Sequence, residues 1–171
     1  MAKHAARKKM PEISVIGDVD DWEDDVVKAL LDIPPGRPCL FYIDSAGGSV
    51  YGALTVMTLI RLRKLDATAV VLGECSSATI LLFAACQKRL VTRYSTFLFH
   101  QMRWQSEKRV GSGEAFRWAK HFDEMEKDID DLQARLFGKG GDKIKAWIEG
   151  GFYVTGPELA EAGLAELLPM E

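Results

Sequence analysis

The chain has few cysteines, no long hydrophobic run and no strong excess of charge. Its three cysteines, Cys39, Cys75 and Cys86, show no C-x-x-C spacing, which excludes a disulfide scaffold and a zinc ribbon. We therefore expect reduced thiols in a cytoplasmic protein without a metal or cofactor. The most apolar stretch, residues 80–86, is far shorter than the ~20 residues of a membrane span. With 22 basic and 25 acidic residues the net charge is −3, so neither nucleic acid nor membrane is an expected partner.

What is present is the composition of one ordinary globular domain. The chain has 171 residues, of which 47% are apolar and 27% charged, and such a chain can bury enough apolar surface to offset the entropy of ordering it. Its first ten residues are basic and lack the apolar segment of a secretory signal. We expect residues 1–12 to form a flexible basic tail, solvated or acting as a weak docking arm, and residues 13–171 to form a single domain.

Short β-rich runs alternate with amphipathic helical patterns through the first hundred residues. We predict strands at residues 13–16, 39–43, 68–72, 89–91 and 96–99, and helices at residues 18–31, 50–65 and 78–86. Asp20 or Asp21 is the expected cap of the first helix. Strands that alternate with helices are joined by crossovers and lie parallel, so the predicted fold class is α/β.

The pattern changes after residue 100. Residues 101–113 are polar and contain glycine, and helices are then expected at residues 114–137, 142–148 and 156–162. Gly163 is the expected C-terminal cap of the last one. The first of these helices is long, and its apolar residues fall on one side: Phe116, Ala119, Phe122, Met125, Ile129, Leu132 and Leu136.

Three short segments lie where α/β proteins place their sites, at the carboxyl ends of strands. The first contains Gly47 and Gly48, which form a plain turn or present backbone amides to a ligand oxygen. The second has Ser76 and Ser77 at a helix start, where a hydroxyl either caps the helix or points outward beside an amide that can hold an oxyanion. The third ends in His100, a structural residue or a base. Together they indicate nucleophilic catalysis, which needs a nucleophile, a base and fixed donors.

These segments, in their order and in their amino-acid sequences, resemble those of the proteolytic subunit of the Clp protease, within the wider Clp protease/crotonase fold. The family's N-S-P-G-G-S-V is matched by residues 44–50, and its G-Q-A-A-S-M-G-A by residues 73–80. Its M-I-H-Q-P is similar to residues 98–102, and its last motif, F-[ML]-[ST]-A-x-E-A-x-x-Y-G-L, to residues 153–164. The resemblance runs over residues 13–168, nearly the whole chain.

The resemblance implies a serine peptidase that cuts short or unfolded polypeptides. Ser77 would be the nucleophile, and His100 would act first as general base and then as general acid. The backbone of Gly47, Gly48 and Ala78 would supply the oxyanion hole.

The resemblance also implies a crotonase-like, repeated β-β-α core with a long handle helix, the handle spanning about residues 101–137. In the family the handle interlocks two rings of subunits. We therefore expect a homo-oligomer of stacked rings, with the apolar side of the long helix as an interface rather than an internal core. The family's axial loops help to dock an ATP-driven unfoldase, but only about a dozen residues, in a segment that is basic overall, precede the first predicted strand here. The unfoldase partner therefore stays open.

One position departs from the family pattern. The family's third triad residue, an aspartate, falls on Gly151 here, and Glu149 is the substitute candidate. Without an orienting carboxylate the histidine tautomer is unfixed, and rate losses of ~10⁴ follow. Three hypotheses stay open: a peptidase in which another group or water orients His100, a catalytically impaired structural or regulatory ring subunit, and a crotonase-type acyl-CoA hydratase or isomerase.

Overall fold

The computed structural model describes residues 9–106 and 109–170. Its strands are β1 (Glu12–Asp18), β2 (Pro38–Gly47), β3 (Asp66–Cys75), β4 (Lys88–Val91), β5 (Thr96–Leu98), β6 (Tyr153–Thr155) and β7 (Glu166–Leu167). Its helices are α1 (Val19–Asp32), α2 (Val50–Leu62), α3 (Thr79–Ala85), α4 (Ser112–Phe137), α5 (Gly141–Gly150) and α6 (Gly156–Glu161), with a 3-10 turn, η1 (Gly138–Gly140). The predicted α/β class is confirmed. Residues 1–8, most of the predicted basic tail, lie outside the described residues.

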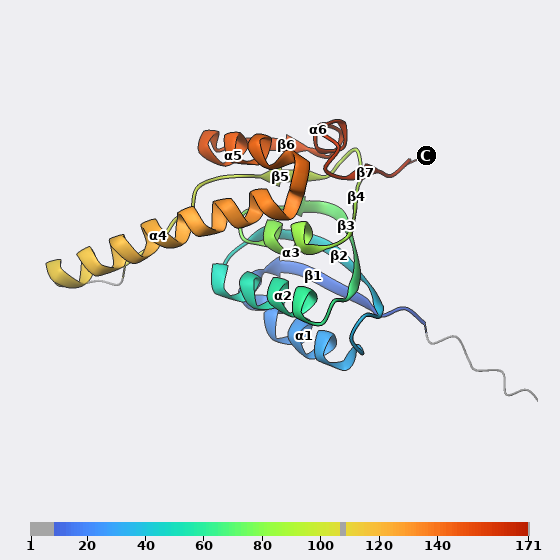
Figure 1. Ribbon diagram of the computed structural model, residues 1–171, viewed down its shortest axis with the longest axis horizontal. Helices are drawn as coiled ribbons and strands as arrows, with labels where there is room; N and C mark the ends of the chain where they lie inside the picture. Colours follow the sequence, from blue (N-terminus) through green and yellow to red (C-terminus); the bar gives the residue numbers. More distant parts are fainter. Residues whose placement is uncertain (1–8, 107–108, 171) are drawn as a thin grey trace, which may run out of the picture.

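The centre of the fold is a parallel sheet in the order β1-β2-β3-β4-β7. Helices α1, α2 and α3 pack side by side next to it, and α4 packs on α3 (Figure 1). Along β2, Phe41 and Ile43 are fully buried, whereas Leu40 and Tyr42 on the other face are half-buried. One face of this strand is thus fully covered and the other only partly. Its continuous apolar run predicts full cover on both faces.

The first helix is capped by a residue other than the two expected ones. Asp18 is the N-cap of α1, and its side chain accepts hydrogen bonds from the first turn. Asp21 stands at the third helical position and accepts the Asp18 N–H at 3.0 Å. The pair forms a reciprocal capping box, so the helix begins before Asp20, and the prediction of Asp20 or Asp21 as the cap is wrong.

The two central strands run further than their apolar cores suggest. β2 continues to Gly47 and β3 to Cys75, beyond the predicted residues 39–43 and 68–72. Their pairing shifts near these ends, because Ile43 faces Val71 whereas Ser45 faces Cys75. β3 therefore carries extra residues, and such a bulge bends a strand.

The bend lets β3 take part in a second, small sheet. Glu74 of β3 pairs with Thr96 of β5, and β5 pairs antiparallel with β6. The end of β5 is thereby carried to the carboxyl ends of β2 and β3, which is where the sequence motifs place the candidate site.

The long helix α4 divides into two halves. Ile129 and Phe137 in its C-terminal half are buried in the core, whereas its N-terminal half reaches away from the body (Figure 1). There Phe116 is 72% exposed. The expectation that the whole apolar side is an intermolecular face is wrong for the C-terminal half, because that half packs on α3 and α5. For the N-terminal half it stays a prediction.

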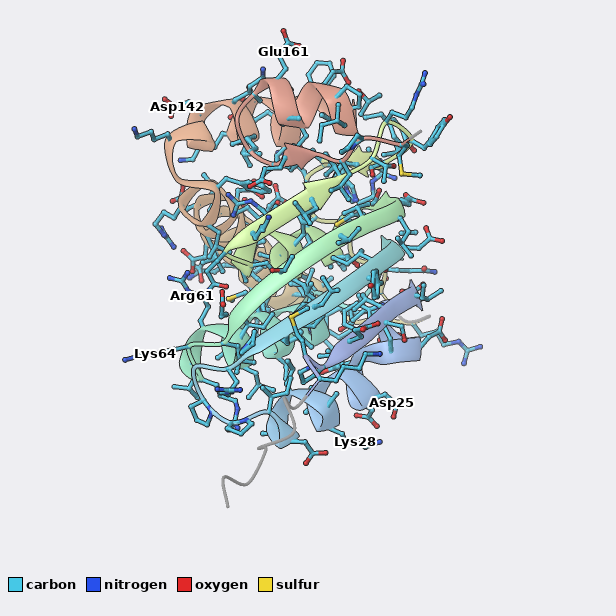
Figure 2. All side chains as sticks on the ribbon, turned by 90° about the vertical axis from the view of Figure 1, so that its right-hand side faces the viewer. Asp25, Lys28, Arg61, Lys64, Asp142 and Glu161 are labelled. Carbon is cyan, nitrogen blue, oxygen red and sulfur yellow. The ribbon has the colours of Figure 1, made fainter. Side chains whose placement is uncertain are left out.

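Charged side chains lie at the periphery of the molecule. Figure 2 shows Arg61, Lys64, Asp142 and Glu161 pointing outward at separate places. Within the described part of the chain, no helix combines the length and the apolar character needed to cross a bilayer.

Candidate active site

One cavity gathers the residues that the sequence motifs single out. It has a volume of about 190 Å³ and is lined by Gly48, Ser77, Ala78 and His100. The remaining lining residues are Val50, Leu81, Met102, Arg103, Ile129, Asp130 and Gln133. The cavity lies where β2 and β3 end and α3 begins, so the three separate motifs meet at one place in the fold.

Ser77 occupies a strained turn between β3 and α3. Its φ of 54° lies in the left-handed region that side chains other than glycine seldom adopt. The N-cap of α3 is Ala78, and no side chain caps this helix, so neither neighbouring serine has the capping role considered above. Among the described residues the Ser77 hydroxyl has no hydrogen-bond partner, and it is left free to face the cavity. A strained strand-to-helix turn is a known way to expose a nucleophilic serine.

Ser76 has a different environment from Ser77. Its side chain is 1% exposed, and its Oγ accepts the Leu98 N–H at 3.0 Å. The Ser77 N–H in turn donates to the Leu98 carbonyl at 3.0 Å. Both bonds join the serine segment to β5, so the Ser76 hydroxyl is already engaged in holding the two together.

The glycine pair lets the backbone of β2 approach the serine. Gly47 and Gly48 have φ values of 109° and 132°, which favour glycine. A Cβ on Gly47 would lie 2.7 Å from the Ser77 Cβ, and a Cβ on Gly48 would clash with the side chain of Asp18. Side chains are therefore excluded at both positions.

Two of the three expected oxyanion donors are unengaged. The Gly47 N–H already donates to Ser45 Oγ at 3.3 Å. The N–H groups of Gly48 and Ala78 have no hydrogen-bond partner within residues 9–106 and 109–170. A substrate oxygen next to Ser77 would therefore accept hydrogen bonds from the N–H groups of Gly48 and Ala78. Gly47 instead allows the backbone of β2 to lie close to Ser77.

His100 follows β5 and is held by its own backbone neighbour. Its Nδ1 lies 2.5 Å from the carbonyl oxygen of Gln101. A carbonyl can only accept, so Nδ1 carries the proton and Nε2 is left as the acceptor in the neutral ring. Within the described residues no hydrogen bond links His100 to Ser77 or to a carboxylate.

The comparisons with known proteins identify the family. A family model for Clp protease matches residues 8–168. The chain belongs to the Clp protease family. The resemblance drawn from four short motifs is confirmed, while the wider relation to the crotonase fold stays a prediction.

Several curated relatives are proteolytic subunits. ATP-dependent Clp protease proteolytic subunit 1 of Bifidobacterium longum is 31% identical over 157 residues, which cover 86% of this chain and 66% of the relative. The ATP-dependent Clp protease proteolytic subunit of Bacteroides fragilis is 26% identical over 168 residues, 94% of this chain and 80% of the relative. That of Porphyromonas gingivalis is 25% identical over 173 residues, 94% of this chain and 75% of the relative.

The resemblance places the family's triad aspartate at Gly151, which follows α5 and precedes β6. β5 and β6 pair Leu98 with Tyr153, and the Phe99 N–H donates to the Phe152 carbonyl at 3.0 Å. The two strands end here, and the same register continued past Phe99 and Phe152 would bring Gly151 opposite His100. Gly151 ends α5 in the left-handed conformation, with a φ of 65°.

The substitute carboxylate considered above is not brought to the site. Glu149 lines a neighbouring cavity together with Lys127, Asp130, Asp131 and Lys145, and not the cavity that contains Ser77. In this Clp protease family member, the group that holds His100 is therefore the Gln101 carbonyl.

A buried polar network supports the glycine segment from behind. Ser45 Oγ lies 2.8 Å from Thr79 Oγ1, and the Trp22 Nε1–H donates to Ser45 Oγ at 3.4 Å. All three side chains are at most 4% exposed. Thr79 is the first residue of α3 and stands where the family motif has glycine. Its hydrogen bond with Ser45 therefore connects β2 to the start of α3, a contact that the motif match does not predict.

Sequence reasoning missed the contribution of α4 to the cavity. Asp130 and Gln133 line it, and neither is among the residues that the sequence singles out. Burial raises the pKa of Asp130 to about 6, with further contributions from the charges of Glu126, Asp131 and Glu149 and an opposing one from Lys145. The sequence carries no clear signal for these two residues, because this half of the helix has other polar side chains at similar spacing.

Among the described residues, no group of three or more histidine, cysteine, aspartate or glutamate side chains is arranged to hold a metal ion.

Proposed function

We propose that this chain is a serine peptidase that hydrolyses short or unfolded polypeptides, with Ser77 as nucleophile and His100 as base. The observation that carries the proposal is the strained Ser77, which shares a cavity with His100 and with the unengaged amides of Gly48 and Ala78. Membership of the Clp protease family and the relatives named as proteolytic subunits support it.

The proposed reaction begins when Ser77 Oγ attacks the carbonyl carbon of a peptide bond and its proton passes to Nε2 of His100. The carbonyl π electrons move to the oxygen, and the N–H groups of Gly48 and Ala78 donate to the resulting oxyanion. One such donor typically contributes ~2.7–4 kcal/mol. The C–N bond then breaks, and His100 gives its proton to the departing amine. Water releases the acyl group from Ser77 by the same steps in reverse.

In this scheme the Gln101 carbonyl does part of the work of the absent carboxylate. It holds Nδ1–H and so keeps Nε2 as the base. A neutral carbonyl stabilises the imidazolium less than a carboxylate does, and replacing a triad aspartate by a neutral group can cost ~10⁴ in rate. We therefore propose turnover slower than that of an enzyme with a complete triad.

The proposal is tested by labelling the purified oligomer with a fluorophosphonate probe and mapping the modified peptide by mass spectrometry. The probe should attach to Ser77, and Ser77→Ala should abolish both labelling and peptide cleavage. Ser76→Ala is the matched control: it removes the neighbouring buried hydroxyl, so labelling should stay at Ser77, at a lower rate because the Leu98 N–H loses its acceptor. Labelling at Ser76, or at no residue of folded protein, would contradict the assignment.

A second candidate function follows from Gly151. A site without a triad carboxylate also suits a catalytically impaired subunit with a structural or regulatory role in a mixed ring. Co-purification with a second subunit that carries a complete triad favours this alternative, whereas peptide turnover by the pure homo-oligomer excludes it.

The assembly belongs to the same proposal. The N-terminal half of α4 exposes Phe116, and Trp104 packs on Phe122 of the same half with ring centroids 5.2 Å apart. We expect this aromatic surface to join subunits in stacked rings. Because the curated relatives are named ATP-dependent, an ATP-driven unfoldase is the further partner to test.

A further inference from the structure

Part of the wall of the cavity that contains Ser77 comes from α4. Asp130 and Gln133 both line it, and residues three positions apart lie on the same side of a helix. Neither residue belongs to the proposed nucleophile, base or oxyanion hole. The cavity therefore holds two polar side chains that the reaction itself does not use.

Neither side chain is satisfied inside the protein. Within residues 9–106 and 109–170, Asp130 and Gln133 have no side-chain hydrogen bond and no ion pair. Gln133 is only 7% exposed, yet its amide is not among the enclosed side-chain atoms without a partner, of which Arg63 Nε is the one found in the described residues. The amide is therefore reached from the cavity that Gln133 lines, where it is free to hydrogen-bond a ligand.

The rest of the cavity is suited to an aliphatic stem. Its other walls include the apolar side chains of Val50, Leu81, Met102 and Ile129. Its volume of about 190 Å³ is smaller than the ~300–1,000 Å³ of pockets for whole drug-sized ligands. It is therefore of a size for one amino-acid side chain with an apolar stem and a polar end.

The charges around Asp130 favour a cation at that polar end. Glu126, Asp131 and Glu149 repel its ionised carboxylate and contribute to a raised pKa of about 6. Lys145 opposes them, but it is paired with Asp131. An incoming cation would relieve this repulsion. Arg103 also lines the cavity, but its side chain is exposed to solvent, where charge is screened more strongly than at a half-buried site.

We propose that this cavity receives the substrate side chain on the acyl side of the scissile bond, and that Asp130 and Gln133 select lysine or arginine there. The inference rests on the proposed function, because the residue whose carbonyl reaches Ser77 has its side chain next to that serine. Methylene groups would pack on the apolar walls while the cation binds the Asp130 carboxylate and the Gln133 carbonyl oxygen. A carboxylate in the pocket beside a catalytic serine selects basic residues in this manner.

The test compares two phosphonate probes that differ only in this side chain, one carrying lysine and the other norleucine. The measured quantity is the second-order rate constant for labelling Ser77 in the assembled protein. The lysine probe should react about tenfold faster or more, as expected for a hydrogen-bonded charge. Asp130→Asn should bring the ratio close to one. Asp128→Asn is the matched control, since it makes the same charge change on an exposed residue of α4 that does not line the cavity.

A simple fluorophosphonate without an amino-acid side chain tests the role of Ser77 separately from the role of the pocket. Its labelling of Ser77 should be the same in the wild type and in Asp130→Asn. If it labels Ser77 while the lysine probe has no advantage, or while Asp130→Asn keeps the full ratio, the pocket assignment is overturned and the peptidase proposal stands. If no probe labels Ser77, both are overturned.

The pH dependence of the lysine-to-norleucine ratio gives an independent readout. Protonation of Asp130 removes its charge, so the preference for lysine should be present above a pH of about 6 and lost below it. Both probes need the same base, so the titration of His100 in its catalytic role cancels in the ratio. Any pH dependence that remains in Asp130→Asn reports the other charged groups near the cavity, and an unchanged profile in that variant would contradict the role of Asp130.

Discussion

Gly151 occupies the position at which the family resemblance predicts the triad aspartate. Gly151 is exposed, and a Cβ added to it would meet nothing within 4 Å. Its left-handed φ of 65° is a conformation that aspartate and asparagine tolerate better than most residues. The register of β5 and β6, continued past its last pair of Leu98 with Tyr153, would bring this position opposite His100. There is thus room for an aspartate side chain at position 151, and a single substitution would supply the missing carboxylate.

Gly151→Asp should therefore raise peptidase activity. A carboxylate at this position would accept the Nδ1–H of His100 in place of the Gln101 carbonyl and stabilise the imidazolium, so kcat/KM should rise about tenfold or more, within the ~10⁴ that a triad aspartate can contribute. Steady-state cleavage of a fluorogenic peptide measures the change. Gly151→Ala shares the backbone cost of ~1–2 kcal/mol without the carboxylate and should show no gain. Equal activities in the two variants would mean that the carbonyl already orients the ring fully.

At this scale the motifs identify some site residues and not others. The match of residues 73–80 to the family motif implies Ser77 rather than Ser76, and the left-handed turn at Ser77 is consistent with that choice. Asp130 and Gln133 cannot be found in this way, because the packing of α4 across the site depends on contacts between segments far apart in the chain.

At the scale of elements, one half of α4 packs in the core and the other half is exposed. Its C-terminal half contributes Ile129 and Phe137 to the core, and its N-terminal half leaves Phe116 exposed. Helical periodicity predicts the helix and its apolar side but not where the core ends, since burial depends on which elements lie opposite. In the same way, apolar runs locate β2 and β3 but miss their extensions to Gly47 and Cys75, which form through pairing with neighbouring strands.

Phe116→Gln should weaken assembly without destabilising the subunit. The side chain is 72% exposed, so its replacement removes little internal packing, whereas an interface would lose a large apolar contact. Sedimentation velocity should show a shift to smaller species, and the thermal unfolding of the dissociated subunit should be unchanged. Arg117→Gln alters the neighbouring exposed residue off the apolar side and should leave the assembly intact. Identical sedimentation of the two variants would place the interface elsewhere.

For the whole molecule, the three cysteines belong to the interior of one continuous core. Each is at most 1% exposed, and all three are free thiols. Burial raises the pKa of Cys39 to about 11 and raises the pKa of both Cys75 and Cys86. Thiols rather than thiolates are therefore present at neutral pH, and the thiolate is the reactive form.

The native protein should accordingly be inert to thiol reagents. Ellman's reagent at a pH of about 8 should titrate no cysteine in folded protein and all three after denaturation. Peptidase activity should be the same with and without reductant, because no disulfide supports the fold. A stoichiometric reaction of Cys75 in folded protein would show that the segment before Ser77 opens readily to solvent.

The bend in β3 has a consequence for how the site can be switched off. The proposed nucleophile and base follow strands of two sheets that share β3. The seam between these sheets at the site consists of the Glu74–Thr96 pair and the two backbone contacts of Leu98 with the serine segment. Parting this short seam would move His100 away from Ser77 while the large parallel sheet stays intact. Activity is therefore less robust than the fold, and loss of function on mild perturbation should precede unfolding.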